Sequence, residues 1–153
     1  MEAKLNAKNL EISRKVAVEI CNLLRYKDVE KAKAILERVI KKKQPIPYKR
    51  YYTSIPHRKG NIATGRYPIK ASGVILKLLD STIKNAQNQG LLSSLYIYSI
   101  YANKGPKQFH PSRHRGRVMK RTHLTIILKE KTKEKKSVKQ KQPKTEEAIK
   151  ENK

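Results

Sequence analysis

Residues 95–102 read LYIYSIYA and residues 122–129 read THLTIILK. Both stretches are rich in Ile, Leu, Tyr and Thr, and apolar residues alternate along them, which predicts two β-strands. The nineteen residues between them, NKGPKQFHPSRHRGRVMKR, are too many for a tight hairpin turn and too rich in proline and glycine for a crossover helix. The sequence therefore predicts an antiparallel hairpin over 95–129 whose connection protrudes as a long arm, residues 103–121.

The segments before this hairpin predict one further strand and three helices. A strand at about 5–12 would complete a three-stranded sheet, because a lone two-stranded hairpin is marginally stable in water. Apolar residues recur at helical spacing in three stretches. The first follows Ser13 and runs to about Tyr26, the second follows Asp28 and stops before Pro45, and the third runs from Pro68 to Gly90. The predicted fold class is α+β, with three helices packed on a small antiparallel sheet.

The positive charge of the chain is concentrated in its middle. The 153 residues contain 37 Lys and Arg against 12 Asp and Glu, a formal charge of +25. Between Arg38 and Lys129 there are twenty Lys or Arg and one acid, Asp80. A compact free protein with this charge would repel itself, so the composition predicts a polyanionic partner that binds this region.

The C-terminal stretch has a different composition. Residues 130–153 contain nine Lys, five Glu and almost no large apolar side chains. Such a segment cannot bury enough apolar surface to offset the entropy of ordering it. We expect a flexible Lys-rich tail over 132–153. A tail of this kind can also be a charged end without a specific role.

The arm has the composition of a phosphate-binding segment. It contains seven Lys or Arg, two His and no acid. The guanidinium of arginine offers a planar fork of donors that matches phosphate oxygens. In an extended strand, Arg113, Arg115 and Arg117 would lie along one side. The cationic residues of the arm are Lys104, Lys107, Arg113, Arg115, Arg117, Lys120 and Arg121, beside His110 and His114.

A second basic region, residues 47–67, has little periodicity and is expected to be an ordered loop. Its basic residues are Lys49, Arg50, His57, Arg58, Lys59 and Arg66. Tyr48, Tyr51 and Tyr52 flank two of these cations, and aromatic rings can stack on unpaired bases. For these loop tyrosines a stacking role and a structural role stay equally open. For the strand tyrosines, Tyr96, Tyr98 and Tyr101, packing within the sheet is favoured.

The sequence does not predict an enzyme, a metal site or a cofactor. Paired carboxylates are improbable where Asp80 is the only acid, and His110 and His114 are too few to hold zinc. Cys21 lies on an apolar helix face, where a thiol behaves as a small hydrophobe, and a single cysteine forms no internal disulfide. Residues 60–67 lack the Lys and Ser or Thr of a phosphate-binding loop. No signal segment or membrane span is expected, and neither is a small-molecule substrate.

Six segments, in order along the chain, resemble one known family. They are Asn9-Leu-Glu-Ile-Ser-Arg-Lys-Val-Ala-Val-Glu-Ile-Cys21, Lys43-Gln-Pro-Ile-Pro-Tyr-Lys49, His57-Arg-Lys-Gly60, Gly65-Arg-Tyr-Pro-Ile-Lys-Ala71, Asn103-Lys-Gly-Pro106 and Arg117-Val-Met-Lys-Arg-Thr-His123. Together they resemble the large-subunit ribosomal protein L-twenty-two family in its archaeal and eukaryotic form, whose eukaryotic member is also called L-seventeen. The resemblance covers about residues 5–131.

The resemblance implies a cytoplasmic protein of the large ribosomal subunit, with a ribosomal-RNA-binding domain over 1–131 and the tail over 132–153. It implies a role in subunit assembly and an arm that lines the nascent-peptide exit tunnel. Ribosomal RNA, neighbouring ribosomal proteins and the nascent chain are the implied partners. Carried over by position, Arg14 and Lys15 join the loop and arm residues as RNA contacts. The tunnel-facing tip would comprise Pro111, Ser112, Arg113, His114 and Arg115.

Two other classes compete with this interpretation. Charge alone would equally suit a free-standing, architectural RNA- or DNA-binding protein. Such a protein would not sediment with large subunits at moderate salt, which separates the two hypotheses. A cationic membrane-surface protein would need wide apolar helix faces with Trp or Phe, whereas the chain has no Trp and a single Phe, Phe109.

Overall fold

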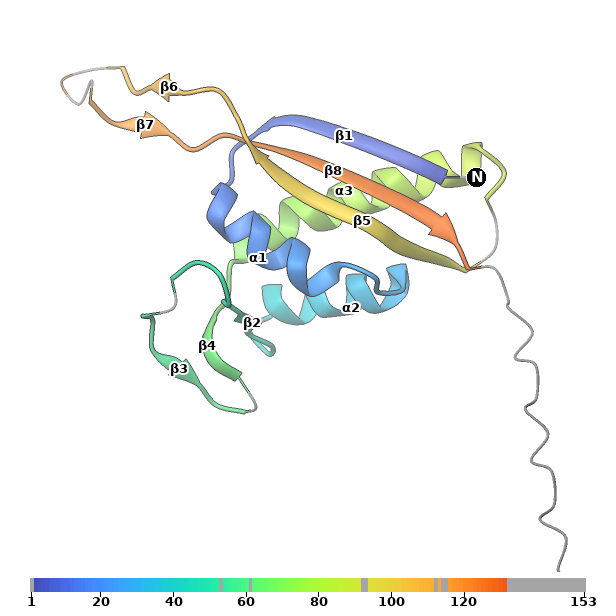
Figure 1. The fold of residues 1–153 in the computed structure, drawn as a ribbon, viewed down its shortest axis with the longest axis horizontal. Coiled ribbons are helices and arrows are strands. Elements are labelled where there is room, and N and C mark those ends of the chain that lie inside the picture. Colours follow the sequence, from blue (N-terminus) through green and yellow to red (C-terminus); the bar gives the residue numbers. More distant parts are fainter. Residues whose placement is uncertain are drawn as a thin grey trace, which may run out of the picture.

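The computed structural model describes residues 2–131, apart from 53, 61, 92–93, 112 and 114–115. Within this range it is an α+β protein with three helices on one side of an antiparallel sheet, and with an arm that extends from one end (Figure 1). The predicted tail, residues 132–153, lies outside the described residues.

The main sheet has three strands in the order β1-β8-β5: β1 (Glu2–Leu10), β8 (Thr122–Glu130) and β5 (Leu95–Lys104). The hairpin strands β5 and β8 are confirmed. The first strand begins earlier than the predicted 5–12, because Ala3 already pairs with Leu128. It ends at a bulge between Ala7 and Leu10, where Asn9 has a φ of 60°. Some inward-facing residues of β1 are alanines, which are small, so the alternation of apolar and polar residues is weak in the sequence.

The helices are α1 (Arg14–Leu24), α2 (Val29–Ile40) and α3 (Ile69–Asn88). Ser13 and Asp28 stand at the N-cap positions as predicted, but neither side chain donates or accepts a capping hydrogen bond. At the end of α3, Gly90 adopts a φ of 77°, a conformation that glycine reaches without a steric penalty. The amide of Leu91 then donates to the carbonyl oxygen of Ala86 at 3.0 Å and closes the helix end.

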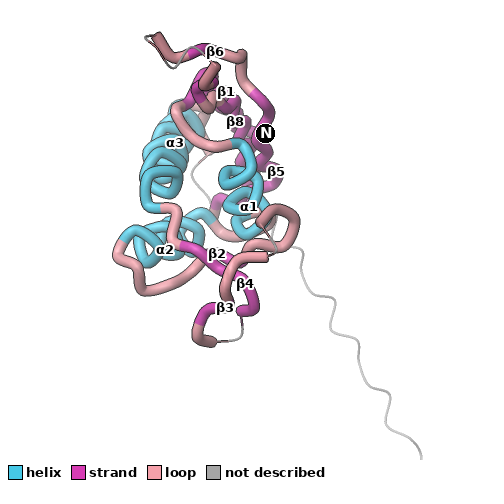
Figure 2. Tube along the Cα trace, turned by 90° about the vertical axis from the view of Figure 1, so that its left-hand side faces the viewer, coloured by secondary structure: helices cyan, strands magenta, loops and turns pink. Residues whose placement is uncertain are grey.

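The core lies between the helices and the inner face of the sheet (Figure 2). Its fully buried large side chains include Ile20, Leu24, Leu36, Ile75, Leu79, Ile97, Ile126 and Leu128. Cys21 belongs to this core, and burial raises the pKa of its thiol to about 12. At neutral pH the thiol is therefore protonated and serves as a small apolar side chain.

The predicted basic loop, residues 47–67, is partly a second small sheet. It has the order β2-β4-β3, with β2 (Ile46–Pro47), β3 (His57–Arg58) and β4 (Ile62–Arg66). The prediction of a loop was wrong here because these strands are two to five residues long, too short for a readable alternation. Gly65 allows β4 to lie close to β2, since a Cβ there would lie 3.2 Å from the Cβ of Pro45, a tight contact.

The arm continues directly from β5 and returns into β8. Part of it forms a short antiparallel ladder of β6 (Gln108–Phe109) and β7 (Val118–Met119). Figure 1 shows this pair projecting away from the body of the molecule. The protruding connection predicted from the length and composition of 103–121 is confirmed.

Candidate nucleic-acid interface

A groove of about 380 Å³ lies where the arm joins the body. Its walls come from the start of α1, from residue 52 and from both sides of the arm base. The lining residues are Ser13, Arg14, Lys15, Tyr52, Lys104, Gly105, Pro106, Lys107, Val118, Met119, Lys120 and Arg121. Six of these are cationic and none is acidic. The groove thus joins predicted RNA ligands that are about ninety residues apart in sequence.

Most of the groove cations are unpaired. Arg14, Lys15, Lys104, Lys107 and Lys120 form no ion pair with a carboxylate in the part of the chain that the structure describes. All except the half-buried Arg14 are exposed. Unpaired cations that line a concave surface focus a positive potential and favour an anionic ligand.

An aromatic layer lies beside these cations. The Nζ of Lys15 is 5.8 Å from the ring centroid of Tyr51 and 5.4 Å from that of Tyr52. The guanidiniums of Arg14 and Arg50 lie 5.9 and 5.4 Å from the Tyr51 ring. Tyr52 is 44% exposed and has a φ of 61°, which is rare for a bulky residue. The rings therefore lie within cation–π distance of these cations, and Tyr52 stays partly exposed to solvent.

A buried carboxylate positions this layer. Glu19 of α1 is 1% exposed, and its two oxygens accept hydrogen bonds from three successive backbone amides. The amide of Lys49 lies at 3.1 Å, that of Arg50 at 2.9 Å and that of Tyr51 at 2.6 Å. The negative charge of Glu19 is thus satisfied inside the protein while the side chains of Lys49 and Arg50 stay exposed. Sequence reasoning missed this role, because only the odd placement of an acid beside the apolar Ile20 hinted at it.

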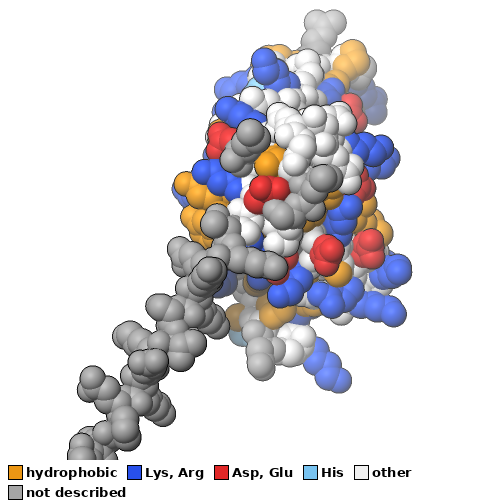
Figure 3. All heavy atoms as spheres, turned by 90° about the vertical axis from the view of Figure 1, so that its right-hand side faces the viewer, with side chains coloured by type: hydrophobic (Ala, Val, Ile, Leu, Met, Phe, Trp, Pro, Cys, Tyr) orange, Lys and Arg blue, Asp and Glu red, His pale blue; other side chains and the backbone are white. Residues whose placement is uncertain are grey.

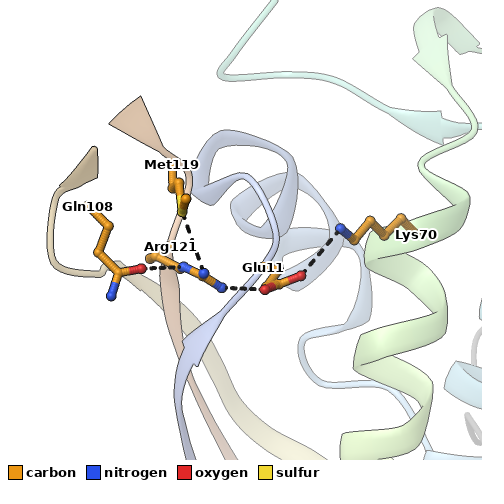
Figure 4. A network of polar contacts seen from close by, with 5 residues as sticks. All are labelled: Glu11, Lys70, Gln108, Met119 and Arg121. Atoms are coloured by element: carbon orange, nitrogen blue, oxygen red, sulfur yellow. Dashed lines mark hydrogen bonds and ion pairs between the residues drawn. The ribbon is translucent and has the colours of Figure 1, made fainter. Parts of the chain in front are cut away.

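Arg121 has a structural position at the base of the arm (Figure 4). Its Nε donates to Gln108 Oε1 at 2.8 Å, and its Nη1 donates to Glu11 Oε1 at 2.8 Å. Its Nη2 lies 3.7 Å from Met119 Sδ. The hydrogen bond and charge of Arg121, with the charge of Lys70 at 3.9 Å, hold the pKa of the Glu11 carboxyl below its usual value. Arg121, which was predicted to bind RNA, is therefore engaged in contacts within the protein.

The base of the arm also needs a glycine, at residue 105. The amide of Gly105 donates to the carbonyl oxygen of Arg121 at 2.9 Å. A Cβ at residue 105 would lie 2.8 Å from both the backbone carbon and the Cβ of Arg121, which is too close for real atoms. Gly105 therefore allows the two sides of the arm to meet.

The second basic patch lies on β3 and β4, and none of its residues lines the groove. Arg58 donates from Nε to the carbonyl oxygen of Gly65 at 3.3 Å and lies 5.6 Å from the ring of Tyr67. Arg66 donates from Nη1 to the same carbonyl oxygen at 3.0 Å. His57, Arg58 and Lys59 are exposed. Figure 1 shows this small sheet and the arm on the same side of the molecule, with α1 between them.

The tip of the arm is only partly described. Pro111, Arg113 and Arg117 are exposed, whereas Ser112, His114 and Arg115 lie outside the described residues. The amide of His110 donates to the carbonyl oxygen of Arg117 at 3.0 Å, so the ladder continues to this point. The predicted row of three arginines remains a prediction.

The opposite end of the molecule carries both signs of charge (Figure 3). There Asp28 pairs with Lys31 at 3.2 Å and also with Lys131, and Glu2 pairs with Lys129 at 3.5 Å. The two lysines hold the pKa of the Asp28 carboxyl below its usual value, chiefly through their hydrogen bonds. Ion pairs thus offset lysine charge at this end, whereas five of the six groove cations at the arm end are unpaired among the described residues.

Two other kinds of site are absent from the described residues. No group of three His, Cys, Asp or Glu side chains there could hold a metal ion. None of the described helices is long and apolar enough to cross a membrane.

The chain is similar in sequence to known proteins. The family model described as ribosomal protein L22p/L17e matches residues 5–129. The large ribosomal subunit protein uL22 of Picrophilus torridus is 44% identical over 103 residues, which are 67% of this chain and 68% of the relative. The proteins of the same name from Nanoarchaeum equitans and Methanococcus vannielii are 41% and 40% identical over 136 residues. Those alignments cover 84% of this chain and 78% and 89% of the relatives.

These matches define the class of protein as a ribosomal protein with a structural role, not an enzyme. The chain belongs to the ribosomal protein L22p/L17e family.

Proposed function

We propose that this chain is a structural constituent of the cytoplasmic large ribosomal subunit and binds large-subunit ribosomal RNA through the groove at the arm base. The relatives are named as large-subunit proteins, which supports the location. The observation that carries RNA binding is the groove itself, with six cations and no acid among its described lining residues. Lysine ammoniums act there as point charges for phosphate, and Arg14 adds a planar donor fork.

The surface is divided over three elements, which suits a role in assembly. The groove at the arm base, the patch on β3 and β4, and the exposed far end of the arm at Pro111 and Arg113 are separate surfaces, so one protein can contact several RNA segments at once. A protein that contacts several RNA segments restricts their motion relative to one another. Neighbouring ribosomal proteins would meet the faces that RNA leaves open. The RNA-binding unit proposed here is residues 1–131.

The test is the salt dependence of binding between purified full-length protein and a large-subunit RNA fragment. Each phosphate neutralised contributes a slope in log affinity against log salt that is about −0.9 on duplex DNA and about −0.7 on single strands, so a steep slope is expected. Duplex DNA of equal length serves as the competitor. A flat salt response, or equal affinity for the DNA, would contradict the proposal and favour a free-standing architectural protein.

We further propose that the arm reaches the channel through which new peptides leave the ribosome. Its length, its exposure and its lack of acids among the described residues support a segment that is ordered by surrounding RNA. A photo-crosslinking amino acid at Arg113 in assembled ribosomes should capture nascent chains, whereas one at Lys84 on α3 should not. Capture of RNA alone from Arg113 would rule out the tunnel assignment.

A further inference from the structure

The outer face of the main sheet is uncovered. All three helices lie on the inner face, and no described segment crosses the other side of the sheet (Figure 2). Strand alternation places Ala3, Leu128 and Ile97 in one inward row and Lys4, Ile127 and Ser99 in an outward row. No described segment of the chain therefore packs on the outer face.

A bulge enriches this face in aromatic side chains. The pairing of β5 with β8 skips Tyr98, because Ile97 pairs with Leu128 and Ser99 with Ile127. The bulge leaves Tyr98 43% exposed, and Tyr101 is 39% exposed. The ring of Tyr96 lies edge-on to that of Tyr98, with centroids 6.5 Å apart at 81°. Packing within the sheet, favoured from the sequence for these tyrosines, thus still leaves Tyr98 and Tyr101 partly exposed to solvent.

The charged groups of the outer face are mostly positive. Lys129 lies with its Nζ 3.8 Å from the ring centroid of Tyr98. Lys4 projects from β1 on the same side, and Lys8, which follows at the bulge of this strand, is also exposed. The acid at this face is Glu2, which pairs with Lys129. Thr125 and Asn6, which are register partners across from Tyr101, add neutral hydrogen-bonding groups.

We propose that the outer face of β1-β8-β5 is a second RNA-binding site, on which unpaired bases stack against Tyr98 and Tyr101. Stacking on aromatic side chains is how a sheet can bind single-stranded RNA, because every base offers a π-face. Lys4 and Lys8 neutralise the adjoining phosphates. A purely apolar protein partner would leave these two lysines desolvated and without a counter-charge. The inference rests on the proposed RNA-binding function and assigns a different surface to it.

The first test uses the absence of tryptophan from this chain. In Tyr101→Trp the introduced indole is the only one, so its emission reports this face alone. Single-stranded large-subunit RNA should quench the emission, and a fully paired duplex should leave it unchanged. An indole at Tyr26, which is 71% exposed on the turn between α1 and α2, is the control and should not respond.

The second test separates stacking from other effects. The double variant Tyr98→Ala, Tyr101→Ala should bind single-stranded RNA at least tenfold more weakly, at roughly the scale of one lost base stack. The matched variant Tyr98→Phe, Tyr101→Phe keeps the ring faces and should bind as the unaltered protein does. If RNA binds normally but neither the indole nor the alanine variant responds, this site is wrong and the groove proposal stands. If the unaltered protein does not bind RNA, both fail.

A third test identifies the occupant in assembled subunits. A benzophenone amino acid at Tyr101 should crosslink to large-subunit RNA. Crosslinking to a neighbouring ribosomal protein instead would overturn the assignment of this face to RNA.

Discussion

At the end of the molecule that carries the arm, Lys15 and Lys104 line a groove without carboxylates, whereas at the opposite end Asp28 and Glu2 pair with three lysines, Lys31, Lys129 and Lys131. The acids near the arm are also occupied: Glu19 is buried against backbone amides and Glu11 is held by Arg121. The comparison teaches that net charge alone does not define the binding end. The binding end is defined by which cations are left without a carboxylate partner.

The largest expected effect is the loss of RNA affinity when groove charges are reversed. The double variant Lys15→Glu, Lys104→Glu should bind an RNA fragment about a hundredfold more weakly and lower the salt slope by about 2, because two phosphate contacts are lost. The control Lys77→Glu, Lys84→Glu makes the same change of charge on α3 and should cost only a few-fold. Equal losses, measured by fluorescence anisotropy at several salt concentrations, would mean that both ends bind alike.

The second effect is on stability and compares a buried glutamate, Glu19, with an exposed one, Glu37. Glu19→Ala leaves three backbone amides without their acceptor and should lower the free energy of unfolding by about 3 kcal/mol. Glu37→Ala, on the exposed side of α2, should change it by less than about 0.5 kcal/mol. Urea denaturation of both variants measures the difference. A small cost at Glu19 would show that the loop is held by other contacts.

A third effect is on the pH dependence of stability at the base of the arm. The pKa of Glu11 is lowered in the folded protein, so its pair with Arg121 stabilises at pH values above the unfolded pKa of about 4.5 and is lost as the pH falls through the folded pKa. The difference in melting temperature between the unaltered protein and Glu11→Gln should therefore be present at neutral pH and shrink in acid. A difference that stays constant into acid would contradict the assignment.

The smallest effect is expected from removing residues 132–153. Truncation after Lys131 keeps its pair with Asp28 and the hydrogen bond from its amide to the carbonyl oxygen of Ser94. The melting temperature should not change, while RNA affinity falls modestly because eight lysines are removed together with four glutamates. A loss of cooperative unfolding would place the domain boundary beyond 131.

The sequence predicted the elements that are long and regular. Each was predicted from a sequence pattern of eight residues or more, which tertiary contacts did not override. These elements are strands β5 and β8, helix α3 and the protruding arm. The predicted loop failed at β2, β3 and β4, because strands of two to five residues carry no measurable period. Their pairing depends on contacts such as the approach of Gly65 to Pro45, which no local pattern encodes.

The candidate site was predicted in its composition but not in its arrangement. Basic residues of the loop and the arm are recognisable by charge, whereas the meeting of Arg14 with Lys120 in one groove depends on how α1 packs beside the arm base. Glu19 and Arg121 were missed as structural groups for the same reason. Their partners lie 30 to 32 and up to 110 residues away in sequence.

The order of strands in the main sheet bears on how the protein folds during its own synthesis. The central strand, β8, is made after both of its neighbours, so β1 and β5 leave the synthesising ribosome before their shared partner exists. Until residues 122–130 emerge, two strand edges are unpaired and open to wrong pairing with other chains. The helices, whose hydrogen bonds are local, can form earlier. The direction of the arm is set in the same late step. When β8 pairs between β1 and β5, it fixes the distance between the two sides of the arm.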